Sequence, residues 1–486
     1  MSIPFNNSYT SLPERFFTRQ DPSTVSKPEL LAVNRPLANY LGIDPDWLES
    51  EEGLEILSGN TIPDGADPIA TVYAGHQFGH WNPRLGDGRA VLLGEVVATD
   101  GERYDIQLKG SGQTPYSRNG DGRAPLGPII REFVVSEAMA SLGVPTSRSL
   151  AAISTGDAVY RESKLSGGVL TRVARSHIRF GTFQYFSSIQ DAEGLKLLVN
   201  HTIERHYPSA NDTDNRALAL FEQVSNRLAE LVAQWQSVGF IHGVMNTDNM
   251  LLCGETIDYG PCAFLDQFDP STVFSSIDHA GRYAYKNQPA IAQWNLACLG
   301  KTLLPLISDD AERATEMAQS ILNQFPEYYG DRYQALMSRK LGLTTRQEDD
   351  PQLIQAFLDL LEANQLDFTL AFRRLADLVC GDEGIRSLFD FPSTCDPWIA
   401  QWQSRCQLEE VNAQSRADQM RATNPVFIAR NHLVEETIEK AYAGDNSAFD
   451  QLNARLSRPF EYAPEDSRFA IPPKPHQVVQ QTFCGT

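Results

Sequence analysis

The chain has 486 residues, of which 42% are hydrophobic and 21% charged, so it can bury a large core and does not belong to the disordered class. Its length exceeds that of most single domains, and we expect two or three packed units. Its 41 Lys and Arg against 62 Asp and Glu give a net charge of −21, which argues against nucleic acid and anionic membranes as partners.

The first 60 residues are polar and interrupted by prolines, and we expect them to form an N-terminal extension with one helix over Pro28–Leu41. Residues 61–175 contain the β-prone runs RAVLLGEVVAT, YDIQLKG and SRSLAAIST, bounded by Gly, Asp and Pro. One helix interrupts them, in the segment GPIIREFVVSEAMASLG, with Pro128 at its start and Gly143 just past its end. This part therefore predicts a strand-rich unit with one helix.

Residues 176–310 have mostly helical patterning. The segment RALALFEQVSNRLAELVAQWQSVG has the apolar spacing of a long amphipathic helix that ends at Gly239. Residues 311–486 continue as helices and close with a Pro-rich tail. The whole chain thus predicts an α+β fold in which strands precede helices.

Two glycines stand in the loop of WNPRLGDGRAVLLGEV, directly before an apolar run. Gly86 and Gly88 lack a Cβ, so backbone N–H groups beside them can approach phosphate oxygens. A tight turn before a strand also requires glycine, and the loop alone does not decide between a phosphate site and a hairpin.

Lys109 closes the run YDIQLKG, and a lysine there either extends to solvent or points into a cleft. The helix that follows carries Glu132, 23 residues further on, which is suited to hold the ammonium group. A strand lysine paired with a helix glutamate is the ion pair of the small lobe of protein kinases. Glu137 lies on the same helix, and periodicity does not choose between the two glutamates.

The most specific segment is GFIHGVMNTDNMLLCGETIDYG, in which a polar loop follows the long helix. Asn249 and Asp258 offer oxygen ligands of the kind that Mg²⁺ prefers, in the order of the kinase motifs HRDLxxxN and DFG. Val244 stands where a kinase has its catalytic aspartate, and Asp248 is the nearest carboxylate that can replace it. A displaced base suggests that the attacking hydroxyl approaches a phosphate other than the γ-phosphate.

Three arginines recur in GGVLTRVARSHIRFGTF, at positions 172, 175 and 179. They share one face if the stretch is a helix and do not if it is a strand, and the sequence leaves this open. They form either an exposed basic stripe or, in so acidic a chain, a site for phosphate oxygens. The loop QTPYSRNGDGRAPLG adds Asp121, Gly122 and Arg123 to the polar Gly-containing loops.

A zinc site at His76 and His80 is the main competing interpretation of the polar motifs. The two histidines lie four residues apart in HQFGH, but no third His, Cys or acidic ligand follows at zinc-ligand spacing. We therefore do not expect zinc.

Taken together, these residues resemble the selenoprotein O family and its bacterial relatives (SelO/YdiU). The resemblance covers most of the chain and rests on the segments YAGHQFGHWNPRLGDGRAVLLGE, QLKGSGQTPYSRNGDGRAPLGP, RVARSHIRFGTF, HGVMNTDNM, IDYGP, NPVFIARNHLVEE and CGT. It implies a bilobal protein-kinase-like fold, with a small lobe at 61–175, a large lobe at 176–310 and extensions at 1–60 and 311–486. It also implies transfer of AMP from inverted ATP to Ser, Thr or Tyr hydroxyls of protein substrates, with release of pyrophosphate.

The resemblance further implies roles for individual residues. Asp248 would accept the hydroxyl proton, and Asn249 and Asp258 would bind Mg²⁺ or Mn²⁺. Residues that would contact the nucleotide or position those that do are Gly86, Gly88, Arg89, Lys109, Asp121, Gly122, Glu132, Arg172, Arg179 and Asp258. Two other functions remain open, an atypical kinase that transfers the γ-phosphate and a pseudokinase scaffold that binds ATP without catalysis.

The cysteines bear on the cellular compartment of the protein and on control of its activity by a disulfide. The chain has seven, an odd number without a CxxC pair, which fits a reducing compartment. The amino end lacks signal-peptide character, and no apolar run approaches the roughly 20 residues of a membrane-spanning helix. We therefore expect a cytoplasmic protein. Some relatives control activity through a disulfide of the terminal cysteine, here Cys484; no cysteine stands in STVFSSIDHAGRY, and Cys262 is the nearest candidate partner.

Overall fold

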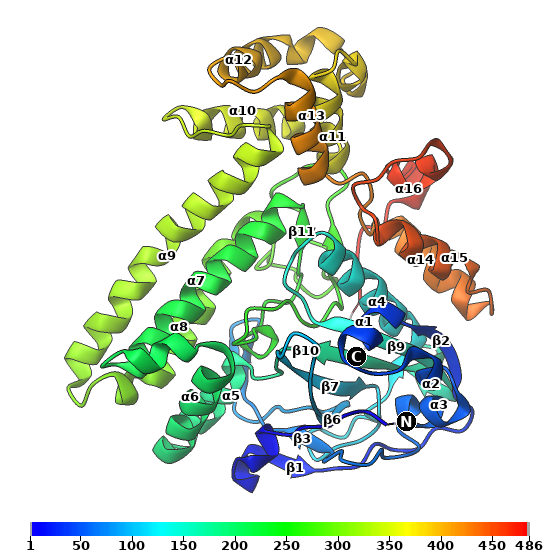
Figure 1. The fold of residues 1–486 in the computed structure, drawn as a ribbon, viewed down its shortest axis with the longest axis vertical. Helices are drawn as coiled ribbons and strands as arrows, with labels where there is room; N and C mark the ends of the chain where they lie inside the picture. Colours follow the sequence, from blue (N-terminus) through cyan, green and yellow to red (C-terminus); the bar gives the residue numbers. More distant parts are fainter. Residues whose placement is uncertain (1, 484–486) are drawn as a thin grey trace.

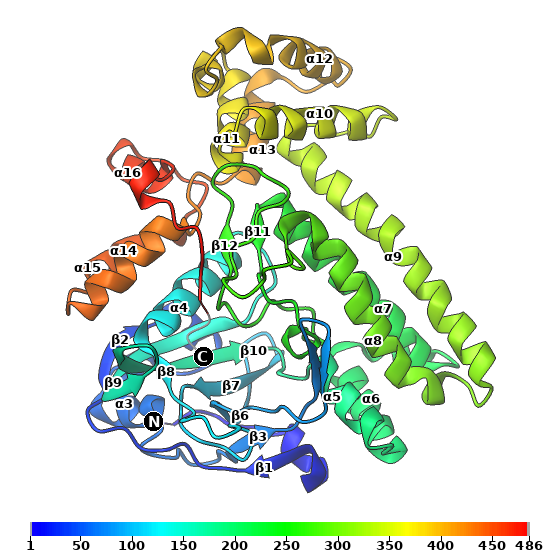
Figure 2. The same cartoon turned by 180° about the vertical axis from the view of Figure 1, so that it is seen from behind.

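Strands gather in the first 175 residues and helices in the remainder, as the sequence predicts. The computed structural model describes residues 2–483. One large antiparallel sheet forms the lower part of the molecule, and long helices extend from it (Figures 1 and 2). The strands are β1 (Phe17–Arg19), β2 (Glu29–Val33), β3 (Ile69–Thr71), β4 (Gly75–Gln77), β5 (His80–Asn82), β6 (Ala90–Val97), β7 (Arg103–Lys109), β8 (Ala124–Pro125), β9 (Arg148–Tyr160), β10 (Lys164–Ala174), β11 (Phe240–Ile241) and β12 (Ala263–Phe264).

The large sheet has the strand order β1-β3-β6-β7-β10-β9-β2, with β8 paired to β10. The predicted runs became β6, β7 and β9, and β9 continues beyond the predicted run to form a long hairpin with β10. Side chains alternate between the faces of a strand. On β6, Leu92 joins one core while Leu93 joins the core on the opposite face.

The predicted helix over Pro28–Leu41 is wrong. This segment divides at Asn34 into strand β2, which pairs with β9, and helix α1 (Arg35–Tyr40). The Asn34 side chain accepts a hydrogen bond from the Leu37 N–H and caps α1. Helices α2 (Pro45–Leu48) and α3 (Glu51–Ser58) follow, and the three pack their apolar side chains on one face of the sheet.

Helix α4 (Leu126–Ser141) is the predicted helix and packs on the opposite face, against β9 and β10. Gly143 follows its end with a φ of 77°, the left-handed conformation that glycine adopts most readily. The side of α4 that faces away from the sheet contacts two helices near the end of the chain, α14 (Asn431–Tyr442) and α15 (Ser447–Leu456) (Figure 1). Arg131 donates to the Asn431 side chain (2.9 Å) and pairs with Glu435, and the Gly127 N–H donates to the Tyr442 hydroxyl (2.9 Å).

The helical part follows β10. Helix α7 (Arg216–Ser237) is the predicted amphipathic helix, and Gly239 after it has a φ of 74°. It packs against α8 and α9, and α9 leads away from the sheet to a group of helices with its own apolar core (Figure 1). The helices are α5 (Phe180–Ser188), α6 (Ala192–His206), α7, α8 (Gln288–Ile307), α9 (Ala311–Lys340), α10 (Asp350–Ala363), α11 (Phe368–Leu378), α12 (Asp396–Cys406), α13 (Ala413–Thr423), α14 (Asn431–Tyr442), α15 (Ser447–Leu456) and α16 (Ser467–Ala470).

The predicted helical character after residue 311 is confirmed by α9 to α16. Within residues 2–483, no helix is both long enough and apolar enough to span a bilayer.

Candidate active site

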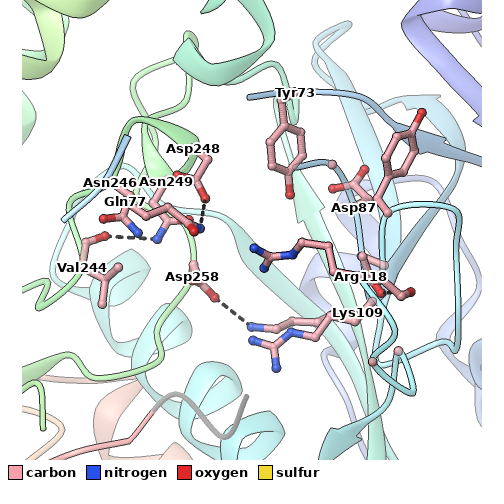
Figure 3. Close-up of a pocket in the computed structure, with 18 of the residues that line it drawn as sticks. Tyr73, Gln77, Asp87, Lys109, Arg118, Val244, Asn246, Asp248, Asn249 and Asp258 are labelled. Carbon is pink, nitrogen blue, oxygen red and sulfur yellow. Dashed lines mark hydrogen bonds and ion pairs between the residues drawn. The ribbon is translucent and has the colours of Figure 1, made fainter. Parts of the chain in front are cut away.

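One cavity of about 1020 Å³ lies where the sheet meets the loops that follow α7 (Figure 3). Its walls come from both the strand-rich and the helical part of the chain. The sequence-predicted residues that line it are Gly86, Gly88, Arg89, Lys109, Asp121, Gly122, Arg172, Arg179, Asp248, Asn249 and Asp258. Residues more than 170 positions apart in the chain thus face one space.

The loop before β6 is folded against residues 114–117. A Cβ on Gly86, whose φ is 119°, would lie 2.4 Å from the Tyr116 ring, and one on Gly88 would lie 2.8 Å from the Tyr116 carbonyl oxygen. The Asp87 carboxylate between them accepts hydrogen bonds from the Thr71 N–H (3.0 Å) and hydroxyl (2.6 Å). Glycine is therefore required here for close packing, and the same packing leaves the loop backbone along the cavity wall.

Lys109 and Glu132 form a buried ion pair at the back of the cavity. Lys109 ends β7, and its ammonium also donates to Asp258 Oδ1 at 3.0 Å. Arg172 on the neighbouring strand β10 donates from Nε to Glu132 Oε1 at 2.7 Å. Burial alone would raise the pKa of Glu132, but Arg172 and Lys109 outweigh it and hold this pKa below its ordinary value. Glu132 therefore stays ionised and fixes both cations.

The structure decides between the two glutamates of α4. Glu137 accepts from the Arg148 guanidinium (2.9 Å) and from the Asn34 side chain (2.7 Å). It therefore joins α4 to α1 and β9, whereas Glu132 contacts Lys109.

Asp258 lies opposite Lys109, and its dashed contact is drawn in Figure 3. Burial opposes its ionisation, but Lys109, Arg89 and Arg172 lower the pKa of Asp258 far below its ordinary value. Its φ is 69°, a left-handed conformation uncommon outside glycine, asparagine and aspartate. The carboxylate is thus a permanent negative charge at the centre of several cations.

Asp248 has a different environment, in a short turn at Thr247–Asn249. Its Oδ2 accepts from the Gln77 amide at 3.1 Å, and its Oδ1 is buried with no hydrogen-bond partner within residues 2–483. Burial, the largest cause, raises the pKa of Asp248 from its ordinary 3.8 to about 6. A carboxylate whose pKa lies near neutrality is suited to accept a proton.

Arg179 precedes α5 and reaches over the cavity. Its guanidinium donates to the Asp248 carbonyl oxygen, lies 3.8 Å from the Asp87 carboxylate and stacks 4.8 Å from the centroid of the Tyr73 ring. Arg172 is on a strand and Arg179 at the start of a helix, so the stretch is neither wholly helix nor wholly strand. Arg175, between them, pairs through its guanidinium with Glu102, donates from its backbone N–H to Glu255, and does not line this cavity.

Asn249 has its amide oriented by the loop. Its Nδ2 donates to the Val244 carbonyl oxygen at 3.1 Å, which leaves the amide oxygen as the atom that can bind a cation. With the Asp258 carboxylate, it supplies two hard oxygen donors on one wall. Mg²⁺ is commonly held by one or two such side chains together with phosphate oxygens and water, so this donor set fits Mg²⁺ or Mn²⁺.

The remaining sequence-predicted positions lie at the rim or elsewhere. Asp121 pairs with Arg161 at 2.8 Å in the outer loop, beside Gly122, whose φ of 66° brings it against Gly112. Cys262, the nearest candidate partner for a terminal disulfide, is buried, and Cys484 lies outside the described residues, so the structure does not test that disulfide.

Sequence reasoning missed Gln77, Tyr73, Asp87 and Asn246, which also line the cavity. In the motif HQFGH, the histidines attract attention as candidate metal ligands. His76 in fact packs between Trp81 and Trp294 (ring centroids 4.9 and 5.2 Å away) and contacts Gln184, whereas the glutamine between the histidines contacts Asp248.

Replacing Lys109 with methionine should reduce the nucleotide transfer that the sequence resemblance implies by about 100-fold or more, since one charged donor to a transition state contributes roughly this much. The protein should stay folded, because Glu132 keeps its contact with Arg172. Transfer of labelled nucleotide and thermal unfolding measure the two effects. Glu137→Gln is the matched control on α4; equal losses in both variants would contradict a special role for the Lys109 pair.

Comparison with known proteins gives matches over nearly the whole chain. The family model for protein adenylyltransferase SelO matches residues 1–457. The chain is 55% identical over 488 residues to protein nucleotidyltransferase YdiU of Rhodopseudomonas palustris (strain HaA2), covering 100% of this chain and 99% of that one. Proteins of the same name from Bradyrhizobium diazoefficiens (55% over 488 residues, 100% and 99% covered) and Rhizobium etli (54% over 493 residues, 100% and 98% covered) match similarly.

These matches, with a cationic cavity that also carries carboxylates, define the class of the protein as a nucleotidyltransferase that modifies proteins. Within that class, the chain belongs to the SelO family of protein adenylyltransferases. The resemblance found in the sequence is confirmed.

Proposed function

We propose that this enzyme transfers AMP from ATP to Ser, Thr or Tyr hydroxyls of other proteins and releases pyrophosphate. The observation that carries the proposal is the single cavity in which Lys109, Arg172 and Arg179 face Asp248 and Asp258. Cations that bind phosphate oxygens and a separate carboxylate of raised pKa are the two components that this reaction requires.

We propose that the fold is a two-lobed, protein-kinase-like one. The sheet with α4 (residues 61–175) would be the small lobe, residues 176–310 the large lobe, and 1–60 and 311–486 the extensions. Support comes from the order of the parts: a strand lysine, a helix glutamate, then the loops with Asn249 and Asp258. Strands β1 and β2 from the first 60 residues form the two edges of the sheet, so that extension would be built into the small lobe.

ATP would lie reversed relative to a kinase, with its α-phosphate nearest Asp248. Lys109, Arg172 and Arg179 would bind phosphate oxygens, with Glu132 holding the first two in place. The loops with Gly86, Gly88, Arg89, Asp121 and Gly122 would contact the rest of the nucleotide. A set with three buried cations suits a polyphosphate that leaves as pyrophosphate.

Asn249 and Asp258 would hold Mg²⁺ or Mn²⁺, which when bound would supply positive charge against the phosphates. The protein residues would do the remainder. Asp248 would take the proton of the acceptor hydroxyl while the hydroxyl oxygen forms a bond to the α-phosphorus. The bond from that phosphorus to the oxygen bridging to the β-phosphate breaks, and both electrons leave with pyrophosphate.

The test uses ATP labelled with ³²P at either the α- or the γ-phosphate, with the purified chain and a protein mixture. We expect label from the α position on protein and none from the γ position. Label only from the γ position would show an atypical kinase. No transfer from either, with ATP still bound, would favour a pseudokinase scaffold.

The cytoplasmic location also stays a prediction.

A further inference from the structure

The hairpin of β4 and β5 is fastened to the loop that carries Asp248. The His76 N–H donates to the Thr247 hydroxyl at 2.7 Å, and the Phe78 N–H donates to the Asn246 side chain at 3.0 Å. The Tyr283 hydroxyl donates to the same Asn246 oxygen at 2.7 Å. The hairpin and the loop therefore form one rigid wall of the cavity, although about 170 residues separate them.

This wall contacts the Asp248 carboxylate on two sides. A Cβ on Gly75 would lie 2.7 Å from Asp248 Oδ1, so the glycine allows that oxygen to pack directly against the backbone of β4. On the other side, Gln77 Nε2 donates to Asp248 Oδ2 at 3.1 Å, as Figure 3 shows. The Asn82 amide donates to Gln77 Oε1 at 3.0 Å. Asn82 thus fixes which end of the Gln77 amide faces Asp248.

The hydrogen bond from Gln77 is the one side-chain hydrogen bond that the Asp248 carboxylate receives within residues 2–483. Arg179, the neighbour that contacts this residue with a charged group, donates to its backbone carbonyl oxygen and not to the carboxylate. If the Gln77 hydrogen bond were lost, the carboxylate would keep only its packing against Gly75, and further orientations would open to it, of which only some face a hydroxyl at the phosphate.

We infer that Gln77 is a positioning residue for the reaction, which holds the Asp248 carboxylate in the orientation that accepts the hydroxyl proton. Asn82 acts one step further out, by orienting Gln77. The inference rests on the proposed role of Asp248. It extends that role to Gln77, whose side-chain hydrogen bonds in this structure join Asp248 and Asn82.

The experiment compares Gln77→Leu, Asn82→Ala and Gln184→Leu by AMP transfer from α-labelled ATP, with kcat and the KM for ATP measured separately. Gln184→Leu is the matched control, because Gln184 contacts the same hairpin through His76 (2.9 Å) without touching Asp248. We expect kcat to fall about 10- to 100-fold in Gln77→Leu, as misplacement of a reacting group does. The fall should be smaller in Asn82→Ala and absent in Gln184→Leu, with an unchanged KM throughout.

A double-mutant cycle separates this role from a general loosening of the loop. If Gln77 acts through Asp248, then Gln77→Leu should cost nothing further in the Asp248→Asn background. A fall of the same size in both backgrounds, or a fall shared by Gln184→Leu, would overturn the inference. If Asp248→Asn alone kept full activity, the proposed base would be wrong instead, so the two failures are distinguishable.

Discussion

Asp258→Asn should lower AMP transfer on the order of 10³-fold, the size expected when a group that binds the catalytic metal loses its charge. Asparagine has the same shape as aspartate and accepts left-handed backbone conformations, so the φ of 69° at this position is kept. What changes is the charge beside Lys109, whose ammonium lies 3.0 Å from the carboxylate.

The loss at Asp258 is measured by incorporation of α-labelled ATP and by thermal unfolding. Asp269→Asn is the matched control, since this exposed aspartate lies eleven residues further along the same segment and its side chain accepts from the Ser271 N–H. Transfer near the wild-type level in Asp258→Asn would remove Asp258 from the proposed metal site.

Asp248→Asn should reduce kcat about 10²- to 10⁴-fold, which is the usual contribution of a general base, with little change in the KM for ATP. The asparagine side chain fills the same volume beside Gly75 and Gln77, but its neutral amide is not basic and cannot accept the hydroxyl proton. A kcat close to that of the wild type would mean that the hydroxyl needs no base at this position.

The same substitution should make the nucleotide-free protein more stable at pH 8. The folded pKa of Asp248, about 6, lies above its ordinary value of 3.8, so the folded protein binds this proton more tightly than the unfolded chain. The cost to stability therefore builds up between about pH 4 and pH 6, where only the unfolded chain ionises, reaches about 3 kcal/mol above pH 6, and is absent below about pH 4. Denaturant unfolding at pH 8 and pH 4 checks both the gain and its disappearance.

Much of the fold follows from local sequence signals. Helices α4 and α7 were predictable because each has a sustained apolar periodicity and a glycine just beyond its end, Gly143 and Gly239. Strands β6 and β7 were predictable from short apolar runs between Gly and Asp. The segment Pro28–Leu41 was not, because ELLAV suits either structure and its pairing with β9 decides the outcome.

The candidate site, too, was predictable from the sequence only in part. Lys109, Asn249 and Asp258 were predictable because they follow one another in the order of the corresponding protein-kinase motifs. Gln77 was not found, since its importance comes from a contact with Asp248 across 171 residues that no local pattern reports. The choice between Glu132 and Glu137 also needed the structure, because both are buried or half-buried on one helix and only their neighbours differ.

The attachment of α4 to the end of the chain has a consequence for control. In protein kinases, the helix that carries the glutamate of the ion pair moves, and activity is switched by that movement. Here Arg131, directly beside Glu132, is tied to Asn431 and Glu435, and the ring of Phe133 packs 5.2 Å from that of Phe449. Helices α14 and α15 thus support α4 on the side that faces away from the sheet. A change that loosened α14 and α15 from α4 would therefore be expected to reach the Lys109 and Arg172 side of the cavity through Glu132.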